Sequence, residues 1–261
     1  MADILIILQA RLSSSRLPGK VLKTLHGKPM LEQQIARFAK IQTPYQLVVA
    51  TSEQPEDDAI ALLCKKLDIN CFRGELNDVL SRFYHAATHI KKQHDIQHIV
   101  RITGDCPVID AKIIDQVIAL YLAKQCDYCS NCAPATFPDG LDVEVFSLAA
   151  LKTAFEQAQK PSEREHVTLF IRNNPNLFTL CNYQNNVDLS HLRWTVDEPA
   201  DFEFVTQVYR ALYPQNKYFD FNDILTLLQQ KPELCSINLG INRNEGLIKS
   251  VQQDNAMDYR S

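Results

Sequence analysis

The chain has 261 residues, of which 46% are hydrophobic and 22% charged, a composition typical of a globular protein with a sizeable core. Its formal net charge of −4 argues against broad binding to nucleic acid or to anionic membranes. No apolar run approaches the ~20 residues that span a bilayer, and the N-terminus lacks the pattern of a secretory signal. We therefore expect a cytoplasmic protein whose eight scattered cysteines are reduced thiols.

The first twenty residues carry the most distinctive pattern. Residues 4–8, ILIIL, are typical of a buried parallel strand, and QARLSSSRLPGK follows directly at 9–20. Backbone N–H groups and serine hydroxyls in such a loop donate to phosphate oxygens, while Arg11, Arg16 and Lys20 supply neutralising charge. The loop matches neither GxGxxG nor GxxxxGK[ST]. It therefore indicates a phosphate-binding loop of another kind, with a solvated surface loop as the alternative.

Strands and helices alternate through the first half of the chain. The alternation indicates a doubly wound, mostly parallel α/β sheet, in which ligands bind beyond the carboxyl ends of the strands. The loop at 9–20 and the TGDCP stretch at 103–107 both occupy that position, so we expect them to share one site. The predicted strands lie at 4–8, 46–51, 70–73 and 98–102, and the predicted helices at 29–39, 56–67, 76–90 and 113–123.

The second half has a more mixed pattern, which favours an inserted or appended α+β lobe on a single domain. The tail after Cys235 shows no strong period and ends polar. The predicted strands of this half lie at 141–146, 177–183 and 191–196, and the predicted helices at 148–159, from 162 onward, at 199–213 and at 220–230.

Two aspartates follow apolar strands and are candidate metal ligands. Asp105 lies between Gly104 and Cys106, and Asp197 lies in RWTVDEP before a helix that begins with proline. Carboxylates at such positions can hold Mg²⁺, which prefers oxygen ligands and shares them with phosphate. Each aspartate alone is equally compatible with a turn or helix cap. If both lie near the basic loop, they suit metal-assisted phosphoryl or nucleotidyl transfer.

Six motifs, in order, resemble one family. QARLSSSRLPGKVL, FRGELNDVLSRF, VRITGDCPVID, FPDGLDVEVFS, PSEREHVT and LSHLRWTVDEP are similar to the SpsF-type spore coat polysaccharide proteins. Those proteins are similar to the cytidylyltransferases that make CMP-activated sialic acid and Kdo sugars. The resemblance covers residues 3–249, including the tail GINRNEGLIKS.

The resemblance implies a nucleotide-diphosphosugar-transferase-like, Rossmann-like fold with a small α+β lobe. It also implies a Mg²⁺-dependent transfer of CMP from CTP to a sugar or sugar acid, with release of pyrophosphate, in the synthesis of a surface polysaccharide or glycan. We accordingly expect one domain at 1–249, with a nucleotide-binding half at 1–133 and an acceptor-binding half at 134–249, then a polar tail at 250–261. A homodimer is a further expectation from the resemblance.

The resemblance also assigns residues on the nucleotide side. Thr103 stands where Kdo cytidylyltransferases carry a glutamine before Gly-Asp, so the contact that reads the base differs there. The assigned residues are Arg11, Ser15, Arg16 and Lys20 in the triphosphate loop, Ala10, Arg73 and Thr103 in the nucleotide pocket, and Asp105 and Asp197 as ligands of Mg²⁺. Arg11, Arg16, Lys20 and Asp105 are the expected catalytic residues.

The acceptor side is expected in two motifs. PDGLDVEVF supplies Asp139, Asp142 and Glu144, and strand alternation places the last two on one face, where they can meet acceptor hydroxyl or amino groups. The alternative is a strand edge that faces solvent. Arg164 and His166 in SEREHVT can bind an acceptor carboxylate or phosphate. Their alternative is surface ion pairing with neighbouring glutamates.

Three other hypotheses stay open. An enzyme that consumes a nucleotide-sugar fits the same fold, although a DxD pair is absent around Asp105. A nucleotidyltransferase that uses another nucleoside triphosphate fits the same motifs. A nucleotide sensor without catalysis is disfavoured by the retained pair of aspartates.

The CxxCxxC spacing at 126–132 resembles a metal motif without an evident fourth ligand, so we interpret it as small packing thiols.

Overall fold

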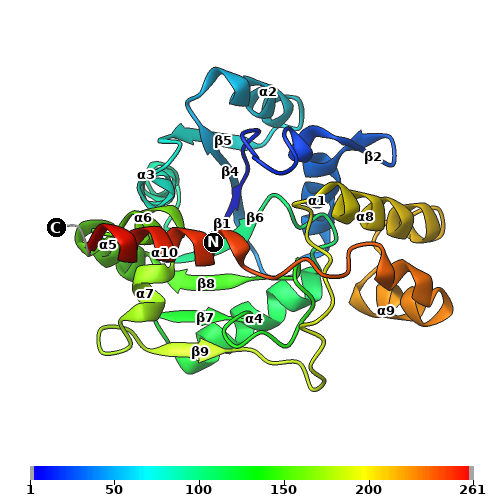
Figure 1. Cartoon of the computed structure of the whole chain (residues 1–261). Helices are drawn as coiled ribbons and strands as arrows, with labels where there is room; N and C mark the ends of the chain where they lie inside the picture. Colours follow the sequence, from blue (N-terminus) through cyan, green and yellow to red (C-terminus); the bar gives the residue numbers. More distant parts are fainter. Residues whose placement is uncertain (1–2, 259–261) are drawn as a thin grey trace.

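The computed structural model describes residues 3–258 and contains a seven-stranded sheet in the order β5-β4-β1-β6-β8-β7-β9 (Figure 1). β8 pairs antiparallel with both of its neighbours, and the other pairs in this sheet are parallel. The strands are β1 (Ile4–Gln9), β4 (Gln46–Ser52), β5 (Asn70–Gly74), β6 (His98–Thr103), β7 (Tyr128–Ser130), β8 (Glu144–Ser147) and β9 (Leu180–Asn182), with β2 (Thr24–Leu25) and β3 (Lys28–Pro29) in a separate hairpin. The predicted mostly parallel α/β class is confirmed.

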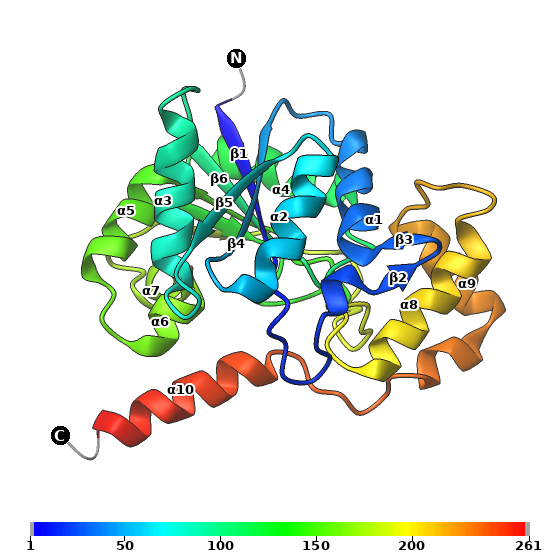
Figure 2. The ribbon, with the colours of Figure 1, turned by 90° about the horizontal axis from the view of Figure 1, so that it is seen from above.

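Helices cover both faces of the sheet (Figures 1 and 2). The first-half helices lie close to their predicted ranges, except that α2 is preceded by a short 3₁₀ turn at Pro55–Asp57. The helices are α1 (Met30–Arg37), α2 (Asp58–Lys66), α3 (Val79–Lys91), α4 (Ala111–Lys124), α5 (Leu148–Gln157), α6 (Pro161–Glu165), α7 (Leu169–Asn173), α8 (Pro199–Leu212), α9 (Phe221–Gln230) and α10 (Glu245–Asp258).

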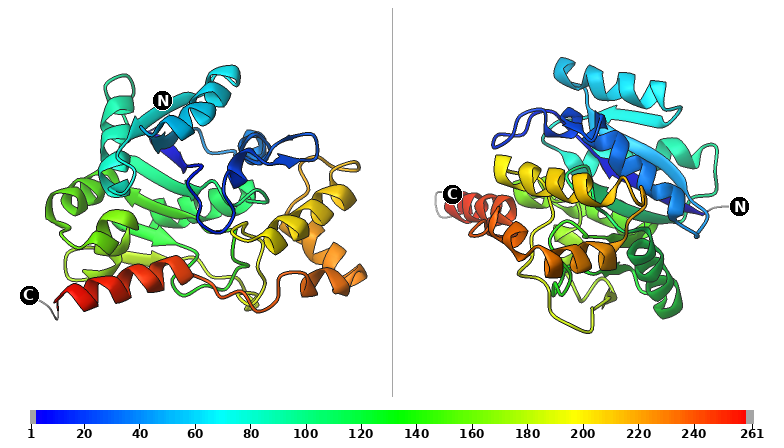
Figure 3. Two further views of the ribbon diagram at one scale, coloured as in Figure 1. Left: turned by 45° about the horizontal axis from the view of Figure 1, so that its top comes forward. Right: turned by 90° about the vertical axis from the view of Figure 1, so that its right-hand side faces the viewer.

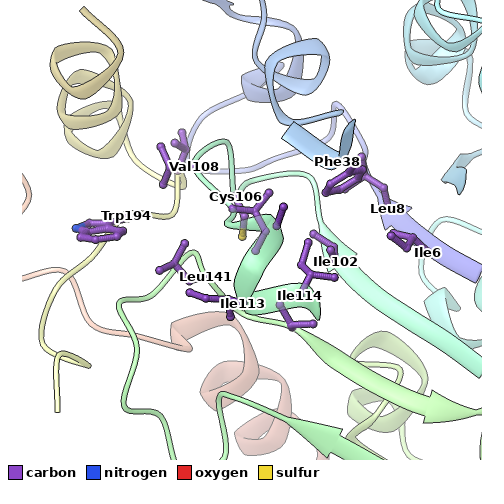
Figure 4. Packing of buried hydrophobic residues seen from close by; sticks show 14 of the residues in the cluster. Ile6, Leu8, Phe38, Ile102, Cys106, Val108, Ile113, Ile114, Leu141 and Trp194 are labelled. Atoms are coloured by element: carbon purple, nitrogen blue, oxygen red, sulfur yellow. The ribbon is translucent and has the colours of Figure 1, made fainter. Parts of the chain in front are cut away.

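The central strand β1 explains how the two faces are packed. Ile4, Ile6 and Leu8 point into one apolar cluster, and Leu5 and Ile7 point into another, because successive strand side chains alternate between faces. The first cluster includes residues of α1, α2, α4, α8 and α9 and is shown in part in Figure 4. The second includes residues of α3, α5 and α7. A strand that is buried on both faces has a continuous apolar sequence, and ILIIL is such a sequence.

Two expectations for the second half are wrong, and one element was not predicted. Residues 191–196 do not form a strand. They lie beside 138–141, and an isolated β-bridge pairs Asp139 with Arg193. The strand predicted at 141–146 begins only at Glu144. The stretch after Cys235 contains a 14-residue helix, α10, although its sequence shows little apolar periodicity. No helix among the described residues is long and apolar enough to cross a membrane.

Gly140 lies where two chain segments approach closely. Its φ is +105°, and a Cβ there would lie 2.6 Å from the carbonyl carbon of Trp194. The segments are joined immediately before this point, since Asp139 N donates to Leu192 O (2.9 Å) and Trp194 N donates to Asp139 O (2.7 Å). Only glycine has both the required conformation and the required absence of a side chain.

We expect Gly140→Ala to lower the free energy of unfolding by about 3 kcal/mol, because it adds both backbone strain and a steric overlap. Urea unfolding followed by far-UV circular dichroism measures the change. Gly246→Ala is the matched control, since a Cβ at that helical position meets no atom within 4 Å. Equal stability of the two variants would contradict this interpretation of the close approach.

Candidate active site

Strand register brings the two predicted loops together. β1 and β6 pair in parallel with Gln9 beside Thr103, so the chain leaves both strands at the same edge of the sheet. Gly104 N donates to Gln9 O at 2.7 Å, which extends the ladder by one step into the loops. A Cβ on Gly104 would lie 3.1 Å from the Ala10 Cβ, so the loops are tightly packed at this point. The two loops therefore lie side by side at one edge of the sheet, and their use as one site stays a prediction.

Lys20 joins this edge to a third segment. Its Nζ donates to Asp197 Oδ1 at 2.7 Å, to Val196 O at 2.8 Å and to Asp105 Oδ2 at 3.2 Å. The segment around Asp197 is itself held over the β6 loop, because Val196 N donates to Asp105 O at 2.8 Å. The two aspartates, predicted from separate motifs, therefore converge on one buried ammonium group.

The ionisation of these groups follows from the same contacts. Burial opposes the charge of Asp105, but Lys20 and the Thr103 hydroxyl, which donates to Oδ1 at 2.5 Å, outweigh it and lower the pKa of Asp105 to about 2. Burial likewise opposes the charge of Lys20, yet Asp105 and Asp197 raise its pKa above the ordinary value. Asp105 and Lys20 are therefore both ionised at neutral pH.

A cavity of about 320 Å³, here called the loop cavity, lies against residues 9–21. Arg11 lines it, and no hydrogen bond or ion pair to its guanidinium is found among the described residues. Behind Arg11 lies Arg82, which is 1% exposed and whose Nε and Nη2 lack hydrogen-bond partners. Burial first, and then the charge of Arg11, lower the pKa of Arg82 to about 10. The predicted residues that line the loop cavity are Ala10, Arg11, Ser15, Arg16, Lys20, Thr103, Asp105 and Asp197.

Arg16 has a different environment from Arg11. It pairs with Asp197 at 3.0 Å and with Glu198 and Glu245 at 3.3 Å each. These partners come from the start of α8 and the start of α10, so Arg16 links the loop to two distant helices. A phosphate that binds Arg16 must therefore compete with carboxylates already in place.

A second cavity of about 260 Å³, here called the inner cavity, lies on the other side of Asp105 and Asp197. Glu144 lies in its wall but is 4% exposed, and its carboxylate accepts from Tyr128 (2.7 Å), from Thr168 (2.5 Å) and from Arg101. The solvent-facing alternative for Glu144 is thus wrong, and its oxygens are already bonded within the protein. The predicted acceptor residues that line this cavity are Asp139, Asp142, Glu144 and His166.

Asp139 and Asp142 form an acidic side of the inner cavity. Burial and the neighbouring Asp142 raise the pKa of Asp139 to about 7, even though Arg243 and Arg193 oppose the shift. Burial also raises the pKa of Asp142, against the effect of Arg243, which donates to Asp142 Oδ1. Asp139 therefore changes its charge near neutral pH, in contrast to Asp105.

Two predicted residues lie outside both cavities. Arg73 donates to Ser52 O and Gln54 O and pairs with Asp58. Arg164 makes a fork to Asp78, with Nη2 at 2.5 Å from Oδ2, and the described residues show no ion pair between it and Glu163 or Glu165, its predicted alternative partners. The structure brings neither arginine to the site, so their predicted contacts with nucleotide and acceptor find no support in its geometry.

Residues not singled out from the sequence complete the inner cavity. Arg172, in α7, lines it and makes no hydrogen bond or ion pair with any described side chain. Burial lowers the pKa of His166, which leaves that ring neutral at pH 7. The sequence signal for Arg172 was slight, since a lone arginine in a five-residue helix looks like any surface cation. Cys132 also lines this cavity, whereas Cys126 and Cys129 lie buried elsewhere in the fold.

Comparisons with known proteins agree with this geometry. The sequence model described as "Cytidylyltransferase" matches residues 5–235. The chain belongs to the cytidylyltransferase family. It is 32% identical over 244 residues to the spore coat polysaccharide biosynthesis protein SpsF of Bacillus subtilis, which covers 90% of this chain and 98% of that protein.

Two further relatives place the chain within the family. A 3-deoxy-manno-octulosonate cytidylyltransferase of Acinetobacter baumannii is 32% identical over 132 residues, covering 49% of this chain and 50% of that protein. A solved cytidylyltransferase from Leptospira borgpetersenii superposes with a TM-score of 0.84 at 32% identity, covering 93% of this chain and all of that one. The chain is therefore a nucleotidyltransferase with this family's α/β fold.

The cytidylyltransferase site has the donor set that a hard divalent cation requires. Asp105 Oδ2 and Asp197 Oδ1 already converge on one cationic atom, Lys20 Nζ. The described residues contain no group of three or more His, Cys, Asp or Glu suited to a metal. Mg²⁺ commonly binds through one or two carboxylates together with substrate phosphates and water. The residues present therefore fit Mg²⁺ that arrives with a nucleotide.

We expect Glu144→Gln to lower the free energy of unfolding by about 3 kcal/mol at pH 7, because it leaves Arg101 buried without an anionic partner. Burial opposes the ionisation of Glu144, but Arg101 and Arg172 lower its pKa from the ordinary 4.5 to about 2. A lowered folded-state pKa stabilises the protein above the unfolded-state pKa and loses that contribution as the pH falls toward 2.

The difference in free energy of unfolding between wild type and Glu144→Gln should therefore become smaller below about pH 4.5. Urea unfolding at a series of pH values measures it. Glu156→Gln, whose pairing with Lys152 is solvent-exposed, is the control and should change stability by only tenths of a kcal/mol. A difference that stays constant between pH 7 and pH 3 would contradict the assigned ionisation.

Proposed function

We propose that this cytidylyltransferase transfers CMP from CTP to a hydroxyl of a sugar or sugar acid, with Mg²⁺ and with release of pyrophosphate. The observation that carries the proposal is the position of the Lys20–Asp105–Asp197 cluster. Asp105 and Asp197 line both the loop cavity and the inner cavity, so a ligand in one would meet a ligand in the other across these carboxylates. The name of the SpsF relative supports a role in polysaccharide synthesis.

The loop cavity suits the triphosphate. Arg11 has no described partner and is backed by the buried Arg82, so positive charge is concentrated where β1 ends. Arg16 and Lys20 add charge, and the Ser15 hydroxyl and loop N–H groups can donate to phosphate oxygens. When bound, Mg²⁺ would neutralise phosphate charge and fix the orientation of the chain of phosphates.

The inner cavity suits the acceptor. Asp139 and Asp142 offer acceptors for sugar hydroxyl groups, and Arg172 offers an unpaired fork for an acidic group. An acceptor hydroxyl oxygen held there attacks the α-phosphorus and loses its proton to solvent, while the bond from that phosphorus to the bridging oxygen breaks and pyrophosphate leaves. Arg11, Arg16 and Lys20 stabilise the negative charge that develops on the leaving group. Positioning and electrostatics thus supply most of the rate. A homodimer stays a prediction.

The test is a pyrophosphate-release assay with Mg²⁺ in which CTP, UTP, GTP and ATP are each offered with a panel of neutral sugars and sugar acids. We expect release with CTP and with at least one acceptor. Pyrophosphate release that depends on a nucleotide other than CTP would show that the enzyme uses a base other than cytosine. Binding of a nucleotide-sugar with transfer of its sugar would overturn the proposed reaction.

We expect Asp105→Asn to lower kcat by about 10²–10³-fold, because it removes the charge that positions both Lys20 and a divalent cation. Pyrophosphate release measures the rate, and binding of CTP without metal shows whether the pocket is intact. Asp115→Asn, at a carboxylate that lines neither cavity, is the control. Near-normal turnover by Asp105→Asn would contradict the assigned role.

We expect Arg172→Ala to raise KM for an acidic acceptor by about 10- to 100-fold, because one charge-assisted hydrogen bond to the acceptor is lost. The affinity for CTP should not change. Steady-state kinetics at saturating CTP measures KM. Arg172→Lys should recover only part of the loss, since lysine lacks the planar fork. An equal increase in KM for neutral and acidic acceptors would show that Arg172 does not recognise the acidic group.

A further inference from the structure

The C-terminal part of the chain crosses the ligand side of the molecule. The match ends at residue 235, and residues 236–256, here called the C-terminal strap, continue past the site into α10 (Figures 1 and 3). Buried polar contacts hold the strap at both ends. Asn238 Nδ2 donates to Arg193 O at 3.0 Å, and Asp254 Oδ1 accepts from Ser162 N at 3.3 Å.

The strap forms a wall of both cavities. Glu245 and Gly246 line the inner cavity and the loop cavity alike, and Lys249 lines the loop cavity. The strap also contacts predicted acceptor residues, since Ser250 Oγ lies 3.1 Å from His166 Nε2. The strap therefore borders the space in which both substrates would bind.

Glu245 takes a position that a phosphate would compete for. Its Oε2 lies 3.3 Å from Arg16 Nη1. Arg16 belongs to the loop that would hold the triphosphate, so a phosphate oxygen and the Glu245 carboxylate would share one guanidinium. Two anions close together repel each other. Nucleotide binding at Arg16 is thus opposed by the strap as it stands in the structure.

Lys249 has the opposite effect. It follows Glu245 by four residues, so both side chains lie on the same side of α10. No hydrogen bond or ion pair to its ammonium group is found among the described residues, and its side chain borders the loop cavity with Arg11, Arg16 and Lys20. A lysine on a flexible stem can follow a phosphate and offer it three donors.

We propose that Lys249 binds the β- and γ-phosphates of the nucleotide and that Glu245 occupies Arg16 until a triphosphate replaces it. The proposal rests on the proposed function, because it needs a nucleoside triphosphate in the loop cavity. The strap thereby adds a phosphate-binding residue to the four-residue set predicted from the opening loop. It also makes the strap sensitive to the length of the phosphate chain.

The test is isothermal titration calorimetry of the full chain with CTP and with CMP, each in the presence of Mg²⁺. We expect Lys249→Ala to weaken CTP binding about tenfold, equivalent to about 1.4 kcal/mol, and to leave CMP binding unchanged. Lys124→Ala, at an exposed lysine at the end of α4, is the matched control and should bind CTP as wild type does. The thermal midpoint of unliganded Lys249→Ala should equal that of wild type, since Lys249 makes no described contact.

Glu245→Gln tests the other half of the proposal. We expect it to strengthen CTP binding several-fold, because the carboxylate that competes for Arg16 is removed. Equal CTP affinity of wild type and Lys249→Ala would overturn the inference, as would an equal loss for CTP and CMP. If wild type binds CTP normally, either of these two results would overturn the inference about the strap but leave the proposed function intact. Wild type that binds no CTP would overturn the proposed function itself.

Discussion

A buried ammonium group between two aspartates is the contact on which the rest of the site depends. Asp105 and Asp197 lie 85 and 177 residues from Lys20 along the chain, yet both contact its Nζ. Burying any one of these charges alone would cost several kcal/mol, and the three become tolerable only together. Because the partners come from three segments, the cluster fixes the loop after β1, the loop after β6 and the start of α8 relative to one another.

The sheet makes this convergence possible. β1 is flanked by β4 and β6 in parallel, so the chain leaves all three strands at one edge (Figure 2). Crossover helices occupy both faces, which leaves the carboxyl edge as the open place for a ligand. The third segment reaches that edge by a different route, through the paired stretches at 138–141 and 192–195 that meet at Gly140. The site thus depends on a close backbone approach as much as on the sheet.

The sequence predicted the first half better than the second for a physical reason. Strands β1, β4 and β6 are largely buried on both faces and have apolar sequences. β7 spans only three residues, too few to show a period, and β9 forms over only three residues of the strand predicted at 177–183. α10 escaped notice because polar contacts such as that of Asp254 hold it, rather than an apolar stripe.

Side-chain direction was the part of the site that the sequence did not determine. Asp105 and Asp197 were identified because each follows the end of a predicted buried segment and their motifs are specific. Arg164 and Arg172 lie eight residues apart on neighbouring short helices, and local pattern cannot tell which one faces a cavity. The structure turns Arg164 to Asp78 and leaves Arg172 in the inner cavity. Contacts between distant segments make that choice, since Asp78 belongs to the N-terminal end of α3.

The pairing of charges bears on how a chain with a net charge of −4 could hold the two anionic ligands of the proposed reaction. Most cations at the site are already held by acids: Lys20 by two aspartates, Arg16 by three carboxylates and Arg101 by Glu144. These pairs keep the side chains in place, so little ordering is left for a ligand to impose. Arg11 in the loop cavity and Arg172 in the inner cavity lack such partners among the described residues. Both guanidinium groups can thus accept an anionic group, and in the proposed reaction Asp105 and Asp197 would lie between the two ligands.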